Sequence, residues 1–287
     1  MRWAAIASAA YWIAFVGAFL AVALWESARP LRALGTPASR RWRNHATLYA
    51  ISILFAAIVL RVTPILLAIS VAHRSWGLLN HAALPAWLRF GLAILALDLV
   101  SWGSHRLFHA IGILWRIHAV HHSDADYDVS TAGRFHPLEA LVTQALYLAA
   151  IALLAPPPAA VLVLQVLTVI QNLFVHANKS LPPAAENTLR FLLITPDFHR
   201  VHHSTEFADQ QSNFGEIFPF WDRLFRTLKA PAPVGALPPV TGLIDIHADD
   251  TQADDTMSIT YLLTSPFRVT RASTSPNPAP QPQSARS

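Results

Sequence analysis

The chain has 287 residues and no cysteine, and 53% of its residues are hydrophobic while only 13% are charged. Soluble domains carry about 25% charged residues, so this composition indicates a membrane protein. The missing thiols exclude a disulfide framework, a cysteine nucleophile and a cysteine metal site. The formal net charge is +4 and the arginines flank apolar runs, which membrane topology explains without a nucleic-acid partner.

The first apolar run, Trp3 to Trp25, is long enough to cross a bilayer, which takes about 20 residues. A cleaved signal peptide is the alternative, because Ala21 to Ala23 resembles a cleavage site. However, the run is longer than the apolar part of a signal peptide, and an arginine-rich segment follows it. Such short loops stay in the cytoplasm. We therefore expect an uncleaved anchor with its N-terminus outside and the loop 26–44 inside.

The second apolar run, 45–72, is interrupted by Arg61 and Pro64. Proline disrupts a helix interior, and a long arginine side chain can reach an interface from within a span. One interpretation is a single kinked span. The other is a short span that ends near Leu60 and is followed by an interfacial stretch.

Three further apolar runs cover 86–102, 138–155 and 159–175, and Pro156 to Pro158 separate the last two. A helix cannot continue through three prolines, so these two runs predict a tight transmembrane hairpin. With four to five spans, and with the loop 26–44 inside, every clustered histidine of the chain falls on the cytoplasmic side.

We divide the chain into four regions. Residues 1–85 form an N-terminal transmembrane region, and 86–230 hold the histidine clusters. Residues 231–270 comprise a linker and an amphipathic segment at Met257 to Phe267 that lies on the domain or on the membrane. The tail 271–287 is rich in Ser, Pro and Gln and is expected to be disordered.

Histidines recur at helical spacing in three short runs, HRLFH at 105–109, HAVHH at 118–122 and HRVHH at 199–203. Residues i, i+3 and i+4 of a helix share one face, so each run is a preformed set of imidazoles. Eight imidazoles at one membrane surface exceed the need of one four-coordinate zinc and suit two metals. His176 and His136, at the ends of the hairpin, are in position to join them.

The chemistry of such a site is narrowed by the motifs that are missing. The zinc-protease pattern HExxH is absent, because HRLFH has an arginine at that glutamate. The Glu-x-x-His pairs of carboxylate-bridged di-iron bundles are absent as well. A histidine-rich pair of metals beside lipid suggests iron and O₂ acting on an unactivated C–H bond.

Four aspartates lie near these runs. Asp98 stands two helical turns before His105 within an apolar span, where a carboxylate is costly. We expect it to accept a hydrogen bond from a metal-binding imidazole, with helix pairing as the alternative. Asp124, Asp126 and Asp128 follow HAVHH, and they either orient imidazoles or lie in a solvated loop.

From about Asp98 to Thr227 the sequence resembles the sterol desaturase / fatty acid hydroxylase superfamily. The resemblance rests on HRLFH, WRIHAVHHSDADYDVSTAGRFHPLE, LFVHANKSLP, TPDFHRVHHS and SNFGEIFPFWDRLFRTL, in this order and spacing. It implies an all-α, polytopic transmembrane bundle with a cytoplasmic helical cap that holds a di-iron site. It also implies an integral membrane enzyme, in the inner membrane of a bacterium, that uses O₂ and two electrons to modify a lipid.

The resemblance implies nine iron ligands, which are His105, His109, His118, His121, His122, His176, His199, His202 and His203. His136 is a further ligand or a hydrogen-bond partner of one. Asn172 stands where some members have histidine, and we expect a weak or water-mediated ligand there. Asp222 either bonds a ligand imidazole or caps a helix.

Two features depart from the family pattern. The family usually has WDRLFGT, and this chain has Arg226 in place of the glycine. This difference puts a loop conformation in question, but it does not affect the predicted metal site. The HPGG signature of a fused b-type cytochrome is absent. We therefore expect a separate electron donor, a ferredoxin or a b-type cytochrome with its reductase.

The sequence thus predicts a lipid hydroxylase with two non-haem iron ions and O₂ as co-substrate. Desaturation by the same site is an open alternative, and so is hydroxylation of a carotenoid-type ring. Rivals from other classes are a metal-binding membrane protein without catalysis, such as a transporter or sensor, and an inactive scaffold. The spans carry few ionisable residues at mid-depth, which disfavours a transporter.

Overall fold

The computed structural model describes residues 2–74, 76–81, 83–230, 238–243 and 255–268. The regular secondary structure of this part of the chain is helical, apart from one isolated bridge between Ser204 and Thr241. The helices are α1 (Arg2–Ala28), α2 (Ala38–Leu60), α3 (Pro64–Ala72), α4 (Leu78–His81), α5 (Ala86–Ala110), α6 (Gly112–His122), η1 (Val129–Gly133), α7 (Pro137–Leu154), α8 (Pro158–Val175), α9 (Pro183–Leu189), α10 (Pro196–His202), α11 (Phe207–Gln210), α12 (Phe220–Leu224), η3 (Asp255–Met257), α14 (Ile259–Thr264) and η4 (Ser265–Phe267).

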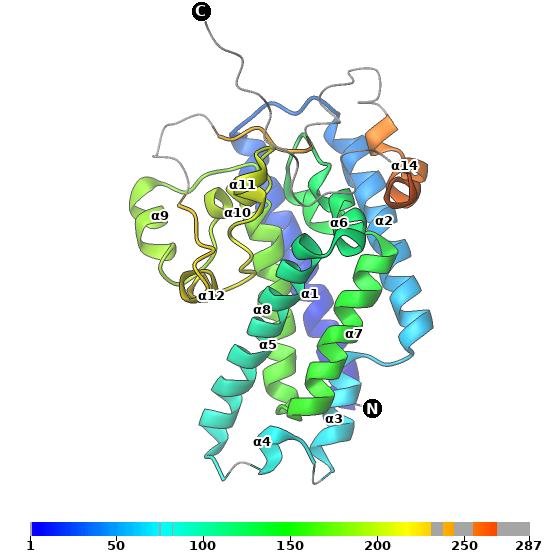
Figure 1. Ribbon diagram of the computed structural model, residues 1–287, viewed down its shortest axis with the longest axis vertical. Coiled ribbons are helices and arrows are strands. Elements are labelled where there is room, and N and C mark those ends of the chain that lie inside the picture. Colours follow the sequence, from blue (N-terminus) through cyan, green and yellow to red (C-terminus); the bar gives the residue numbers. More distant parts are fainter. Residues whose placement is uncertain (1, 75, 82, 231–237, 244–254, 269–287) are drawn as a thin grey trace, which may run out of the picture.

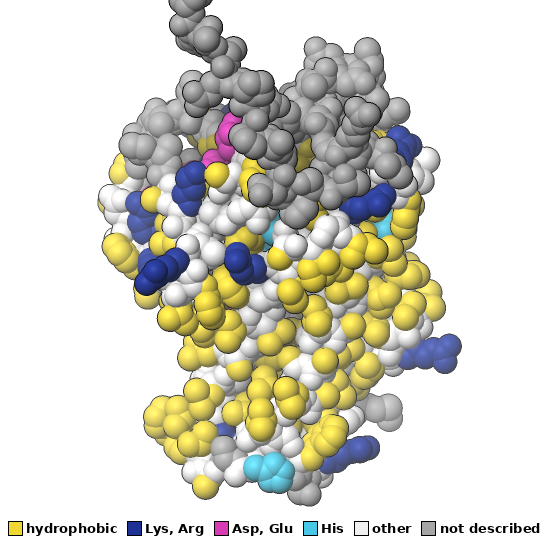
Figure 2. Space-filling model, in the orientation of Figure 1, with side chains coloured by type: hydrophobic (Ala, Val, Ile, Leu, Met, Phe, Trp, Pro, Cys, Tyr) yellow, Lys and Arg dark blue, Asp and Glu magenta, His cyan; other side chains and the backbone are white. Residues whose placement is uncertain are grey.

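Five helical stretches are long and apolar enough to cross a membrane, which confirms the upper end of the expected four to five spans. They cover Ala5–Ala28, Ala38–Ala72, Ala86–Ala110, Pro137–Leu154 and Pro158–Val175. Large apolar side chains on these stretches point outward, for example Ile13, Ile58 and Trp87. The outward surface is hydrophobic over most of the visible face, and Lys and Arg lie mainly beyond this belt (Figure 2). A surface of this kind is suited to contact with the hydrocarbon core of a bilayer.

The helices fall into two zones along the molecule. The long helices α5, α7 and α8 run from the end that carries α3 and α4 to the opposite end, where α6 and α9 to α12 gather (Figure 1). The connection between α1 and α2, which is rich in arginine, also lies at the end with α6 (Figure 1). The short polar helices therefore form a cap on one end of the bundle.

The break predicted near Arg61 and Pro64 is present. Helix α2 ends at Leu60, Arg61 adopts a left-handed φ of 55° as its C-cap, and Pro64 starts α3. Proline suits the first turn of a helix because that turn needs no N–H donor. Ala68 and Val71 of α3 pack into the core formed with α7 and α8, so this stretch is part of the bundle.

The Pro156–Pro158 junction forms the tight hairpin that the sequence predicts. Helix α7 ends at Leu154, Ala155 adopts a φ of 48°, and Pro158 opens α8. Ala155 is buried in the same core as Ile151 and Leu164. The hairpin thereby returns the chain to the cap end directly after α7 has left it.

A buried ion-pair network ties the segment after α6 to α2. Arg41 donates to both carboxylate oxygens of Asp124, at 2.7 and 2.8 Å, and to Asp128 at 2.9 Å. Burial alone would raise the pKa of Asp124, but Arg41 outweighs it and holds this pKa well below its usual range. Asp126 accepts hydrogen bonds from the backbone N–H groups of Gly35 and Thr36. None of these three aspartates bonds an imidazole. Asp124 and Asp128 are buried and not solvated, whereas Asp126 is partly exposed.

The amphipathic segment near the C-terminus lies on the domain. Leu262 of α14 is fully buried against Leu48 of α2 and Val120 of α6. The backbone carbonyl of Thr256 accepts a hydrogen bond from Arg134, and that of Met257 accepts one from Asn44 of α2. The expected disordered tail 271–287 and most of the linker, 231–237, lie outside the described residues.

Candidate metal centre

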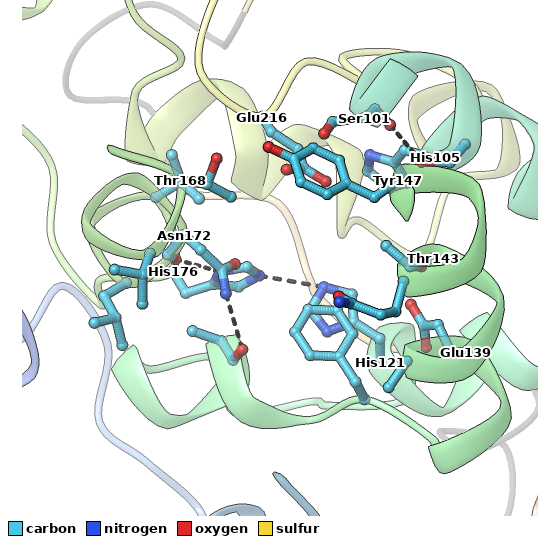
Figure 3. A pocket seen from close by; sticks show the side chains of 18 of the residues that line it. Ser101, His105, His121, Glu139, Thr143, Tyr147, Thr168, Asn172, His176 and Glu216 are labelled. Atoms are coloured by element: carbon cyan, nitrogen blue, oxygen red, sulfur yellow. Dashed lines mark hydrogen bonds between the residues drawn. The ribbon is translucent and has the colours of Figure 1, made fainter. Parts of the chain in front are cut away.

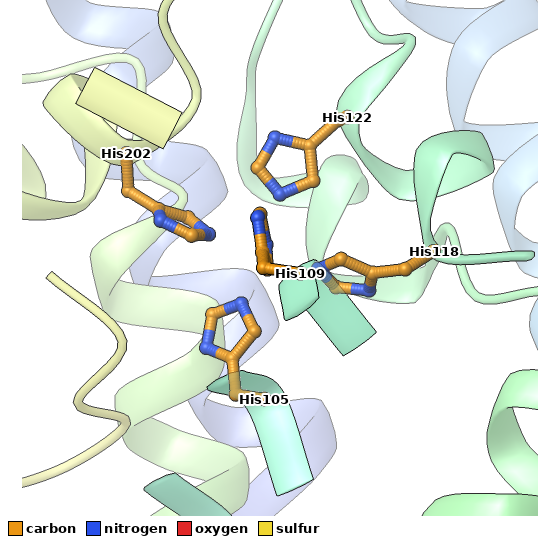
Figure 4. A group of neighbouring side chains, drawn as sticks. All are labelled: His105, His109, His118, His122 and His202. Carbon is orange, nitrogen blue, oxygen red and sulfur yellow. The ribbon is translucent and has the colours of Figure 1, made fainter. Parts of the chain in front are cut away.

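The cap end brings all nine histidines that the resemblance implies as ligands into two groups. The first group comprises His105, His109, His118, His122 and His202, and the second His121, His176, His199 and His203. Within each group the nearest ring nitrogens all lie within 4.8 Å of one another. Figure 4 shows the first group, whose rings converge from three helices.

Both HxxHH runs are divided between the two groups. His118 and His122 of α6 lie one helical turn apart and join the first group, whereas His121 joins the second. The run in α10 divides in the same way, with His202 in the first group and His199 in the second. Adjacent residues on a helix point about 100° apart, so one short helix can serve two neighbouring sites.

The first group has its ring nitrogens arranged for ligation. The Nδ1–H groups of His105 and His202 donate to the carbonyls of Phe214 and Ser212, at 3.0 and 2.7 Å. The Nδ1–H of His118 donates to the carboxylate of Glu139 at 2.5 Å. Within the part of the chain that the structure describes, these bonds leave the Nε2 atoms of the three rings buried and without a hydrogen-bond partner. A buried lone pair without a partner is costly, and a metal ion is its natural partner.

The second group shows the same pattern more tightly. The Nδ1–H of His176 donates to the carbonyl of Asn172 at 2.7 Å. Its Nε2 lies 3.3 Å from Nε2 of His121 and 3.1 Å from Nε2 of His199. Three ring nitrogens this close need a cation among them or a proton between them. Both groups therefore fit metal ions of the kind that prefers neutral imidazole.

Burial keeps these imidazoles neutral. It lowers the pKa of His118 to about 3 and that of His176 to about 4. It also lowers the pKa values of His122 and His203 well below the usual range, and neighbouring imidazoles lower them further. Neutral imidazole is the form that binds metals.

Glu139 is a site residue that was not predicted from the sequence. This residue is 3% exposed and lies in the first turn of α7, where it accepts the hydrogen bond from His118. The available signal was an acidic residue at the start of an otherwise apolar helix, which is costly unless it is bonded. It stands three residues after His136 in the motif RFHPLE.

Asp222 acts on the first group through one intervening residue. Its carboxylate accepts from the backbone N–H groups of Phe214 and Gly215, at 3.0 and 2.7 Å, and from Nε1 of Trp102 at 3.0 Å. A Cβ at Gly215 would lie 2.9 Å from this carboxylate, so the approach requires glycine. Asp222 thus holds the carbonyl of Phe214 toward His105, and it bonds no imidazole itself.

The other expected site residues lie beside the two groups. Asp98 accepts a hydrogen bond from Nε1 of Trp221 at 2.7 Å, and so joins α5 to α12 without touching an imidazole. His136 caps the start of α7 by accepting from the N–H of Leu138, and its other nitrogen bonds the carbonyl of Leu263. It is in neither group. Asn172 donates its side-chain amide to the carbonyl of Ala132 at 3.0 Å.

A cavity of about 320 Å³ lies between the helices beside the two groups. Five of the nine histidines line it, namely His105, His118, His121, His176 and His199. One wall is aromatic, with Tyr11 and Phe15 of α1 and Tyr49 of α2. In Figure 3, Glu139 and Thr143 of α7 line one side of the cavity, and the His176 imidazole lies on the opposite side. Both groups therefore face one shared cavity between the helices.

Comparison with known families finds a match for the region that holds the histidines. The family model described as fatty acid hydroxylase matches residues 90–227, which hold all nine histidines of the two groups. Over this region the chain matches the fatty acid hydroxylase family, which confirms the resemblance to the sterol desaturase / fatty acid hydroxylase superfamily seen in the sequence. The match lies inside the region 86–230 that was expected to hold the clusters.

Curated relatives include several enzymes that act on lipids. The chain is 32% identical to the ornithine lipid hydroxylase OlsE of Rhizobium tropici over 56% of this chain and 49% of that protein. It is 31% identical to the alkylglycerol monooxygenase of Homo sapiens over 48% of this chain and 30% of that protein. It is 32% identical to the very-long-chain aldehyde decarbonylase GL1-1 of Oryza sativa subsp. indica over 56% of this chain and 27% of that protein. The chain thus spans less than half the length of these relatives. No solved structure matches it.

Proposed function

We propose that the chain is a membrane-bound, O₂-dependent lipid hydroxylase whose two histidine groups each hold one iron ion. The observation that carries the proposal is the pair of buried imidazole groups with free ring nitrogens, both open to a cavity inside a membrane-type bundle. Bound iron would supply activation of O₂ and removal of hydrogen from an unactivated C–H bond, which acids and bases do not perform.

The chain's own residues set the geometry for this chemistry. The carbonyls of Phe214 and Ser212 and the carboxylate of Glu139 fix the proton of each bonded ring on Nδ1. This leaves Nε2 as the ligand atom and limits rotation of the ring. The cavity would hold one segment of a lipid beside both groups.

The substrate is a lipid, as it is for the relatives whose names specify ornithine lipid and alkylglycerol. A hydrocarbon chain suits the apolar wall of α1 and α2, and an approach from within the bilayer would spare it passage through water. Hydroxylation is the preferred reaction because both of these relatives are named as hydroxylase or monooxygenase. Two electrons per turnover would come from a separate redox protein.

The orientation that we propose places the centre at the cytoplasmic face of a bacterial inner membrane. The arginine-rich connection between α1 and α2 lies at the same end as the two histidine groups (Figure 1). Short basic loops are retained in the cytoplasm.

Mass spectrometry of total lipids from cells that express the chain under ¹⁸O₂ tests the proposal, with the His121→Ala variant as control. A lipid that gains one labelled oxygen only with the unaltered chain supports a hydroxylase. A lipid that loses two hydrogens without label would establish a desaturase instead. Iron analysis of the purified protein supplies the second readout, in which about two iron ions per chain are expected and none would refute the proposal.

A further inference from the structure

Four large apolar side chains are exposed on the cap, outside the five candidate spans. Phe191 and Leu192, in the turn after α9, are 64% and 65% exposed. Leu224 and Phe225, at the C-terminal end of α12, are 66% and 48% exposed. Arg223 joins the two segments, because its guanidinium donates to the backbone carbonyl of Phe191 at 2.9 Å and lies 5.5 Å from the centre of that ring. These four apolar side chains, named the α12 patch, form a surface of the kind that marks an interaction site.

The α12 patch lies beside a candidate span and not beyond its end. Nε1 of Trp221 in α12 donates to Asp98 of α5 at 2.7 Å, and the ring of Phe225 stacks on that of Trp102 of α5 with centroids 4.5 Å apart. This span ends at Ala110. At 1.5 Å per residue, Trp102 and Asp98 lie about 12 and 18 Å before that end. Both contacts therefore fall at depths that a hydrocarbon core about 30 Å thick covers.

The segment that leads into α12 holds the helix at this depth. Ile217 is buried in a core cluster with Leu97 of α5 and Leu164 of α8, which both belong to candidate spans. Leu193 and Phe218 pack against the same cluster. Figure 1 shows α12 as the cap helix that lies nearest to the end with α3 and α4. On the face drawn in Figure 2, hydrophobic side chains continue from the bundle to the position of α12. The α12 patch thus extends the apolar belt of the bundle.

The charges around the α12 patch suit lipid head groups. Arg223 and Arg226 flank Leu224 and Phe225, and both arginines are exposed. The one acidic residue of the segment 217–230, Asp222, is fully buried. An arginine at a membrane surface lays its apolar stem along the acyl chains while its guanidinium reaches the phosphates. A protein partner at this depth would itself have to lie in lipid, so the bilayer is the occupant that the position favours.

We propose that the α12 patch is inserted into the leaflet on the cap side of the bilayer, with its four apolar side chains at the boundary between head groups and acyl chains. The cap is then partly submerged in the membrane, although none of the candidate spans includes residues 176–230. This inference goes beyond the proposed function and requires no bound iron, because it rests on the position of α12 beside α5. A chain that oxidises no lipid would therefore contradict the proposed function and leave the insertion untouched.

Fluorescence quenching tests the insertion, because the chain has no cysteine of its own. Phe191→Cys and Leu224→Cys are each labelled with an environment-sensitive fluorophore in the purified full chain, which is placed in phosphatidylcholine nanodiscs. Lipids that carry a nitroxide near the head group should quench both labels, and more strongly than lipids that carry it at the end of the acyl chain. Iodide in the buffer should quench both labels weakly. The two positions lie on different segments, so the result does not depend on a single variant.

Two exposed positions serve as controls. Ile13→Cys, on the candidate span of α1, should be quenched by the lipid nitroxides and not by iodide. Ala208→Cys, on α11 of the cap, should be quenched by iodide and not by the lipid nitroxides. If the labels at positions 191 and 224 behave like the label on α11, the patch faces water and the proposal is wrong. If neither lipid nor iodide quenches them, a second copy of the chain covers the patch, which also overturns the proposal.

Discussion

Glu139 is the carboxylate on which the first histidine group depends most directly. Replacement by alanine would remove the acceptor of the His118 Nδ1–H and leave this ring free to turn. Loss of such a partner lowers metal affinity by about 10- to 100-fold. We therefore predict that Glu139→Ala retains about half of the iron of the unaltered chain after dialysis against a moderate chelator, as measured by elemental analysis.

Glu139→Gln serves as the matched control because its amide oxygen still accepts the bond. It should retain more iron than Glu139→Ala. Full iron retention by both variants would show that the bond to Glu139 does not support the centre.

Arg226 is an exposed arginine held at a φ of 59°. A left-handed backbone costs a non-glycine residue about 1–2 kcal/mol, while glycine loses about 0.5–1 kcal/mol more entropy on folding. Arg226→Gly should therefore raise the free energy of unfolding by roughly 0.5–1 kcal/mol, measured by denaturant unfolding in detergent. The departure from the family pattern thus marks a strained turn.

Arg43→Gly is the matched control for this prediction, because Arg43 is exposed within the helix α2. Glycine there should lower stability by about 1 kcal/mol. If both changes lower stability equally, the strain assigned to Arg226 is absent.

At the scale of elements, α2 holds the segment that follows α6 through the buried guanidinium of Arg41. Removing one partner of a buried ion pair costs about 3–5 kcal/mol because the other charge remains buried. Arg41→Ala should therefore reduce the yield of folded protein sharply, as judged by size-exclusion chromatography in detergent. Arg43→Ala, two residues further along the same helix and exposed, should have little effect. Similar yields for the two would show that the network contributes little.

The sequence predicted these elements to different degrees. Long apolar runs and proline positions define the spans, the break after Leu60 and the hairpin at Pro156–Pro158, because these signals are local. Helical spacing also brings the histidines of each run onto one side. Local spacing did not reveal that α6 and α10 each serve both groups, since this depends on how the helices cross.

The partners of the acidic residues were the hardest to foresee. Asp98 was expected to accept from an imidazole, yet it accepts from Trp221, which lies 123 residues away in the chain. Arg41 belongs to the arginine-rich segment whose charge predicts the topology, but it is buried against Asp124. A carboxylate in an apolar segment indicates that a partner exists, whereas the identity of this partner is fixed by tertiary packing.

At the scale of the whole molecule, the proposed orientation is testable because the chain has no cysteine of its own. Ser39→Cys places a thiol at the histidine end and Ala83→Cys places one at the opposite end, both at exposed positions. A membrane-impermeant maleimide added to intact spheroplasts should label Ala83→Cys and spare Ser39→Cys, and lysis should expose both. The reverse pattern would place the histidine groups on the outer face.

The distribution of the histidines along the chain has a consequence for biogenesis. Both groups include histidines of α10 or its C-cap. Without them the first group would lose His202 alone, and the second would keep only His121 and His176. At about 5–20 residues per second, α10 is synthesised roughly 4 to 16 s after α6. Neither group is complete until the last span, α8, has been made and α10 has docked behind it. If the groups bind iron as proposed, its loading would be a maturation step that follows membrane insertion. A ribosome that stalls before α10 would release a fully inserted bundle in which both groups lack ligands.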